Sequence, residues 1–232
     1  MNWLKGLVFE AAGNFDSATE LYKEIQKADE TNSLVRKRLV AVLRAQNHIP
    51  EAIKELNHYL QSYMSDFEAW MEMCDLYLHE LDYTKAAFCV EEMLLINPYN
   101  HLLHQKYGEI KYTMGGQENM EHAKKYFAHA LKLNPNNMRA LYGFFLSASH
   151  LAQRGTNSKA KKDNAEYAET AWKQIMSKYE EKNPTMVAEQ QPQYLAITGM
   201  MTTMQISPNH WICQFVATGS SGKDFRDDTI CS

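Results

Sequence analysis

The chain has 232 residues, 45% of them hydrophobic, which is enough to build a core in one large domain or two small ones. Its 24 lysine and arginine residues against 28 aspartate and glutamate residues give a formal net charge of −4, which excludes the strongly basic proteins that grip nucleic-acid phosphates. Its four cysteines form no CxxC pair, which favours a reducing compartment, and no apolar run approaches the roughly 20 residues of a transmembrane helix. We therefore expect no nucleic-acid partner and no direct membrane insertion.

A repeat emerges when the chain is aligned on one small residue in four similar strings, DSATELY, PEAIKEL, TKAAFCV and EHAKKYF. The aligned residues are Ala18, Ala52, Ala86 and Ala123, at intervals of 34, 34 and 37 residues. A period of about 34 residues is typical of tetratricopeptide repeats, in which each unit is a pair of antiparallel helices. The sequence therefore predicts an all-α solenoid whose helix pairs stack into a right-handed superhelix.

The unit at residues 67–100 matches the repeat consensus best, with Trp70, Tyr77, Ala86 and Pro98 at consensus positions. Ala86 allows close approach where the two helices cross, and Pro98 stops the second helix. In the other units we assign structural repeat positions to Ala18, Ala52, Ala123, Phe127 and Pro135.

The period divides the chain into five units, at about residues 1–32, 33–66, 67–100, 101–137 and 138–180. We attribute the 37-residue interval to the turn YTMGGQENMEH, whose glycines suit a connection about three residues longer than the others. In the fifth unit the polar stretch Arg154–Asn164 is predicted to be an exposed loop, followed by a helix ending at about Tyr179.

Both ends of the array carry further expectations. Residues 181–207 are predicted to form a linker and a short helix at Tyr194–Ile206, and residues 208–232 a disordered tail. At the other end we expect missing upstream sequence, because no preceding helix covers the apolar side of the first helix. Self-association through that helix is expected from Trp3, Leu4, Leu7 and Val8.

The tail contains a string that mimics a phosphate-binding loop, since Ala217 to Lys223 have its spacing. Asp224 stands where a hydroxyl residue should hold magnesium, and only eight residues follow it, too few for a helix and a returning strand. We therefore expect no nucleotide and no other cofactor.

Other candidate ligands have structural explanations. His101 and His104 are spaced to share a helix face, but no third metal ligand stands at a fitting interval, so we expect no metal. Cys74 and Cys89 are expected on the inner faces of one unit, as small core residues. Methionines at helical spacing are expected in the core, with Met71 as the exception that faces the hollow side.

Tetratricopeptide arrays usually bind partners in a concave groove, lined by the second, fifth, ninth and twelfth residues of each first helix. These positions include Leu34 and Leu102, and we assign the protein-binding groove to Lys37, Arg44, Met71, Asp75, Leu78, Gln105, Glu109 and Tyr112. A merely solvated position is the alternative for each polar residue. Lys37 and Arg44 lie two turns apart, and reversing both charges is expected to release a partner's carboxylates without unfolding the chain.

Several strings outside the general consensus carry a more specific resemblance: VRKRL, EAIKELNHYL, DYTKAAFCVEEMLLINPYNHL, KYTMGGQEN, SASH and KKDN. Over about residues 4–180 the chain resembles the family of subunit 2 of the ER membrane protein complex. The resemblance implies a cytosolic scaffold, held on the ER surface by the other subunits, in a complex that inserts tail-anchored and multi-pass proteins into the ER membrane. Residues 208–232 match nothing in that family.

Two other classes of function remain as alternatives. A chaperone adaptor would clamp an acidic C-terminal peptide, but its clamp needs Asn at the ninth position of the first helices, where Ala41, Asp75 and Glu109 stand. The two carboxylates would repel such a peptide. An enzyme is not expected, because no Ser/His/Asp or Cys/His grouping has supporting context.

Overall fold

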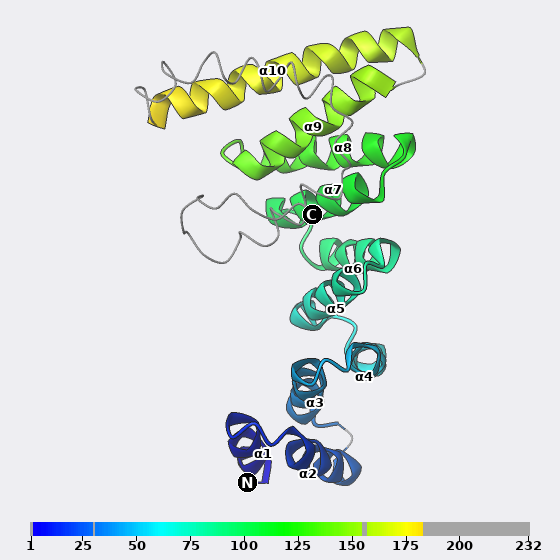
Figure 1. Ribbon diagram of the computed structural model, residues 1–232, viewed down its shortest axis with the longest axis vertical. Coiled ribbons are helices and arrows are strands. Elements are labelled where there is room, and N and C mark those ends of the chain that lie inside the picture. Colours follow the sequence, from blue (N-terminus) through cyan, green and yellow to red (C-terminus); the bar gives the residue numbers. More distant parts are fainter. Residues whose placement is uncertain (1, 30, 155–156, 183–232) are drawn as a thin grey trace, which may run out of the picture.

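The structure is a computed structural model that describes residues 2–29, 31–154 and 157–182. Within these ranges the chain forms ten helices and no strand, which confirms the predicted all-α tetratricopeptide solenoid. The helices follow one another in a single stack from α1 to α10 (Figure 1). Their bounds are α1 Asn2–Ala11, α2 Phe15–Ala28, α3 Ser33–Ala45, α4 Ile49–Ser62, α5 Phe67–His79, α6 Tyr83–Ile96, α7 His101–Met114, α8 Gln117–Leu133, α9 Met138–Arg154 and α10 Ser158–Lys182.

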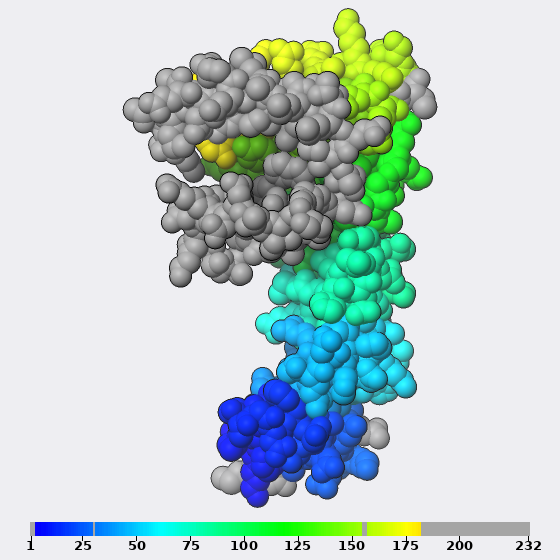
Figure 2. Space-filling view, viewed as in Figure 1, coloured from blue at the N-terminus to red at the C-terminus, as the bar shows by residue number. Residues whose placement is uncertain are grey.

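Each helix packs mainly on its neighbours in sequence, so the molecule is elongated. We call α1, α3, α5, α7 and α9 the first helices, and α2, α4, α6, α8 and α10 the second helices. In the lower half of Figure 1, α1, α3 and α5 lie on one side of the stack and α2, α4 and α6 on the other. Figure 2 shows the blue-to-cyan part of the chain as a slender column. We call the surface formed by the first helices the first-helix face.

The aligned alanines lie at the crossings of the helix pairs. Ala18, Ala52, Ala86 and Ala123 are all 0% exposed. The larger side chains four residues later share the same helix face and are buried as well, at Tyr22, Leu56, Val90 and Phe127. The small residue thus brings the backbones together, and the large residue one turn later fills the core.

Phe127 shows how closely the helices of the fourth and fifth units approach one another. Its ring lies between Gly108 on α7 and Gly143 on α9, where an added Cβ would come within 2.9 and 2.4 Å of the ring. Any larger residue at Gly143 would collide with it. The two glycines therefore make room for the aromatic core of this end of the array.

The polar residues at the unit ends begin the next first helix. The side-chain oxygens of Asn32, Asp66, Asn100 and Asn137 accept hydrogen bonds from backbone N–H groups in the first turns of α3, α5, α7 and α9, at 3.0–3.2 Å. An N-terminal cap satisfies a backbone donor that has no partner within the helix. Trp70 adds a bond across the preceding turn, since its Nε1 donates to the Met64 carbonyl at 2.7 Å.

The connection between α7 and α8 corrects one prediction. It contains only Gly115 and Gly116, both with positive φ (71° and 81°), so the turn is not longer than its equivalents. The additional residues instead lengthen α8, which has 17 residues where α4 and α6 have 14. Glycine suits this tight turn because it adopts positive φ without a steric penalty.

The predicted loop at Arg154–Asn164 is also corrected, because Arg154 belongs to α9 and α10 begins at Ser158. The Asn157 side chain accepts a hydrogen bond from the backbone N–H of Lys159 at 2.9 Å and so starts the helix. Alanine and lysine are good helix formers, and the lysine side chains of this stretch are exposed or half-buried, whereas Asn164 is buried. The polar composition of this stretch therefore did not distinguish an exposed helix from a loop.

Candidate partner-binding face

The residues assigned to the groove all lie on α3, α5 and α7, but they differ in what they contact. Met71 is 41% exposed, whereas Gln105 is buried. Leu78 and Tyr112 are half-buried and pack against the core, and burial raises the pKa of Tyr112. Of the three apolar side chains assigned to the groove, only Met71 therefore presents a largely open surface.

The charged residues of this face pair with one another across successive first helices. Five contacts make up what we call the ion-pair ladder: Glu10–Arg38, Lys37–Asp66 (2.5 Å), Arg44–Glu72 (3.4 Å), Asp75–Lys106 (2.7 Å) and Glu109–Arg139 (2.5 Å). Each pair joins one first helix to the next first helix or its N-terminal cap. The ladder thus links all five first helices of the described chain.

Lys37 sits at the most crowded step of the ladder. Its Nζ is 2.5 Å from Asp66 and 3.7 Å from Glu68. Burial alone would raise the pKa of Asp66, but hydrogen bonds from Lys37, Tyr59 and the Ala69 backbone outweigh it and lower that pKa. Lys37 therefore stabilises the α3–α5 junction through two carboxylates, and its contact with a partner's carboxylate stays a prediction.

Arg44 differs from Lys37 in its exposure. It makes one 3.4 Å contact through Nη1 with Glu72, and its side chain is 57% exposed. A guanidinium carries five N–H donors in a planar fork, so this contact leaves donors directed toward solvent. Of the two cations, Arg44 keeps more of the accessibility that carboxylate binding requires.

Gln105 and Glu109 belong to a polar network between α7 and α9. Gln105 donates to Glu109 at 2.9 Å and accepts from the Asn137 side chain at 2.8 Å. Arg139 reaches both carboxylate oxygens of Glu109, at 2.5 and 3.1 Å. Because these groups satisfy one another, Gln105 and Glu109 stabilise the helix junction, and their assignment as partner contacts stays a prediction.

The exposed apolar side chains of the face were only partly anticipated. Leu34, Met71 and Leu102 are 47%, 41% and 55% exposed. Met71 lies four residues before Asp75, and Leu102 four residues before Lys106. Since Asp75 and Lys106 are in contact and a step of four residues keeps the same helix face, we expect Met71 and Leu102 to lie near each other, one turn before this pair. The rule that the second, fifth, ninth and twelfth residues of each first helix line the groove predicted all three residues on this face. Leu34 and Leu102 were not among the residues that we assigned to the binding site.

The two histidines and two cysteines considered as candidate ligands contact other residues of the helix array. His104 on α7 is buried beside His129, and its Nε2 donates to the Pro98 carbonyl at 2.8 Å, whereas His101 contacts the side chains of Asn134 and Asn137. No cluster of three or more metal-ligand residues occurs in the described part of the chain. Burial raises the pKa of the thiols of Cys74 and Cys89 to about 11 and about 12. Both cysteines belong to the core, as expected.

Two predictions fall outside the described residues. They are the helix at Tyr194–Ile206 with its linker, and the tail at residues 208–232 that contains the phosphate-loop mimic. At the other end of the chain, Trp3, Leu4 and Val8 on α1 are exposed and Leu7 is half-buried. No helix within the described ranges is long and apolar enough to cross a membrane.

Comparison with known proteins gives a consistent set of relatives. Residues 2–126 match the family model described as the EMC2 TPR-like repeat domain. The chain is 46% identical over 207 residues to ER membrane protein complex subunit 2-B of Xenopus laevis, covering 89% of this chain and 69% of that protein. It is 33% identical to ER membrane protein complex subunit 2 of Dictyostelium discoideum, covering 66% of this chain and 51% of that protein.

Solved structures share the fold at low identity. A crystal structure of MamA superposes with a TM-score of 0.56 at 17% identity, covering 77% of this chain and 91% of that chain. A tetratricopeptide repeat protein from Parabacteroides merdae superposes with a TM-score of 0.54 at 18% identity, covering 87% of this chain and 78% of that chain. At these identities the likeness concerns the helical repeat architecture alone.

Proposed function

The chain belongs to the family of subunit 2 of the ER membrane protein complex, and we propose that it is a non-catalytic scaffold subunit of that complex. In this role it binds cytosolic segments of membrane-embedded partner subunits on its first-helix face. It acts from the cytoplasmic side of the ER membrane and supports the insertion of tail-anchored and multi-pass proteins. It reaches the membrane through its partners.

The observation that carries the proposal is the apolar pair Met71 and Leu102 on the first-helix face. Both are more than 40% exposed, and they lie one turn from a charge pair that is already satisfied. A desolvated apolar contact supplies most of the free energy in a typical protein interface. Arg44, whose side chain is 57% exposed, adds hydrogen-bond donors for one carboxylate of the bound segment.

The ion-pair ladder explains why this face suits a scaffold. It fixes the spacing of successive first helices, so the partner meets a surface whose shape exists before binding. A preorganised surface loses less conformational entropy on association than a flexible one. The partner segment expected from this surface offers apolar side chains to Met71 and Leu102 and an acidic residue to Arg44.

The test is a pull-down from detergent-solubilised ER membranes with the double variant Met71→Glu/Leu102→Glu. A carboxylate at each position would be desolvated by the partner, so we expect recovery of the other complex subunits to fall about tenfold or more. Both side chains are exposed, so the fold should persist, and circular dichroism provides the folding control.

The matched control is Leu95→Glu/Ile96→Glu on the second helix α6, where the two side chains are 77% and 42% exposed. This variant carries the same added charge on the other set of helices. We expect it to recover the partner subunits at wild-type yield. If the control loses the partners and the Met71/Leu102 variant keeps them, binding uses the second helices and the proposed face is wrong.

A further inference from the structure

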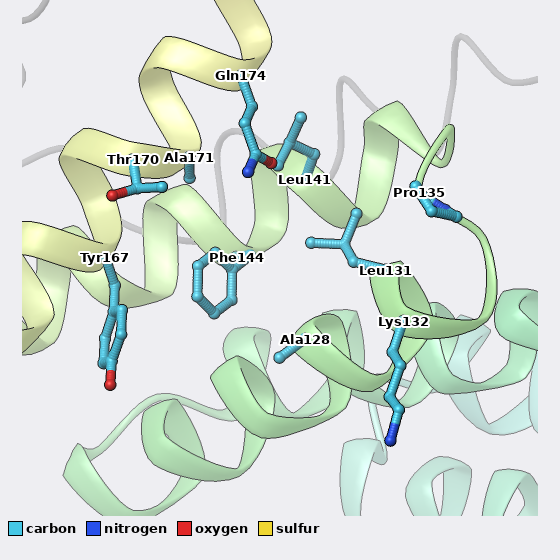
Figure 3. A pocket seen from close by; sticks show the side chains of 10 residues that line it. All are labelled: Ala128, Leu131, Lys132, Pro135, Leu141, Phe144, Tyr167, Thr170, Ala171 and Gln174. Atoms are coloured by element: carbon cyan, nitrogen blue, oxygen red, sulfur yellow. The ribbon is translucent and has the colours of Figure 1, made fainter.

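An apolar groove lies between the second helices α8 and α10, with α9 as its floor. Its volume is about 440 Å³, and its walls include Ala128 and Leu131 of α8, Leu141 and Phe144 of α9, and Tyr167 and Ala171 of α10. Figure 3 shows the side chains of Leu131 and Phe144 in the space between the three helices. The groove is separate from Met71 and Leu102, which lie on α5 and α7.

Hydrogen bonds from two lysines hold the groove at both ends. Near Tyr167, the Lys124 Nζ of α8 donates to Asn164 of α10 at 2.6 Å. Near Pro135, the Lys178 Nζ of α10 donates to the Pro135 carbonyl at 2.6 Å and to the Asn136 side chain at 2.9 Å. Asn164 and Lys178 are 14 residues apart on α10, which at 1.5 Å per residue separates the two bridges by about 21 Å, and the lining residues of α10, from Tyr167 to Gln174, lie between them.

We propose that this groove is the intramolecular docking site of Tyr194–Ile206 of the same chain. This segment, YLAITGMMTTMQI, contains no charged residue. Tyr194, Ile197, Met201 and Met204 recur at spacings of three and four residues, which places them on one side of a helix. Methionine side chains adapt to irregular apolar surfaces, so they suit a groove lined by leucine, phenylalanine and alanine.

The lengths of the segment and its tether fit the groove. As a helix, 13 residues span about 20 Å, close to the length between the two lysine bridges. The described chain ends at Lys182, only four residues beyond the bridge made by Lys178. Residues 183–193 provide an 11-residue connection that can extend to about 36 Å, which is ample for the chain to turn back. A short tether also keeps the local concentration of the segment in the millimolar range.

Hydrogen–deuterium exchange of the full chain tests the proposal. We expect amides of residues 194–206 to exchange at least about tenfold more slowly than those of an unstructured chain, at every protein concentration. Ala128 is an exposed residue of the groove wall, and Ala128→Arg should fill the groove and remove the protection. The matched control is Ala165→Arg, at an exposed position of α10 outside the groove wall, and it should leave the protection intact.

A second pair of substitutions tests the segment itself. Met201→Asp/Met204→Asp should release the segment and accelerate its exchange to the same extent as Ala128→Arg, while circular dichroism of the array stays unchanged. Unstructured exchange rates in the wild-type chain would overturn the proposal, and so would equal protection in Ala128→Arg and Ala165→Arg. Protection that grows with protein concentration would show that a second copy fills the groove, which also overturns it.

Discussion

At the scale of one residue, Lys37 shows that a charged residue at a groove position can pair with a carboxylate of the next first helix instead of remaining unpaired. The pattern of first helices placed Lys37 on the correct helix, but it contained no information on pairing with a neighbouring helix. The ladder partners are separated by 28 to 31 residues, for example Arg44–Glu72 and Lys106–Asp75. Opposite charges at nearly one repeat length were therefore a usable signal that the sequence analysis did not seek.

Reversal of the Lys37 charge should destabilise the array. Lys37→Glu would place a third carboxylate beside Asp66 and Glu68 and remove a charged hydrogen bond, so we expect a loss of about 1–2 kcal/mol in the free energy of unfolding. Urea titration measures this loss, with Lys54→Glu at an exposed position of α4 as the control. Equal stability of the two variants would mean that the Lys37 contacts contribute nothing to the junction.

His104 makes a pH-dependent contribution to the free energy of unfolding. Burial lowers its pKa below the ordinary value of 6.5, and the nearby His129 also lowers it, although the hydrogen bond to Pro98 opposes both effects. As the pH falls below about 6.5, the unfolded chain binds the proton first, so the free energy of unfolding should decrease. Above that pH the contribution of neutral His104 is fully present.

The measurement is urea unfolding between pH 7.5 and 5.5. His104→Phe should reduce the loss of stability over this range, and His79→Phe at an exposed position should leave it unchanged. Burial also lowers the pKa of His150, so part of the loss should remain in the first variant. An identical pH profile for wild type and His104→Phe would contradict the assignment.

At the scale of helices, the sequence predicted the elements well wherever period and composition agreed. Ala86, Phe127 and the polar residues at the unit ends identified the helix crossings and starts. Two predictions were wrong, the longer turn before α8 and the loop before α10, and they share a cause. Glycine pairs and polar runs are typical of loops, but here the residues that follow them extend the N-terminal ends of the helices. The groove between α8, α9 and α10 could not be predicted, because it depends on how three helices are spaced.

Enlarging the residue at a helix crossing tests the register of the repeat. Ala86 is 0% exposed, and Ala86→Leu would force a larger side chain between α5 and α6, so we expect a loss of roughly 1–3 kcal/mol in the free energy of unfolding. Thr84→Leu on the same helix is exposed and serves as the control. Wild-type stability of Ala86→Leu in urea would show that the crossing lies elsewhere.

At the scale of the whole molecule, an elongated stack of five helix pairs exposes a large surface on each side (Figure 1). Its first helices are joined by the ion-pair ladder, and the exposed apolar residues Leu34, Met71 and Leu102 lie on that side. A chaperone adaptor would instead need cations available for a peptide's carboxylates, yet Lys37, Lys106 and Arg139 are each paired within the chain. The surface therefore favours a scaffold for partner subunits.

The proposed membership of the complex is tested most directly by the proteins that co-purify with the tagged full chain. The chain would be isolated from ER membranes solubilised in a mild detergent, and the associated proteins would be quantified by mass spectrometry. We predict the other subunits of the ER membrane protein complex in amounts close to that of the chain itself. Recovery of a cytosolic chaperone in their place, or of the chain alone, would contradict the scaffold account.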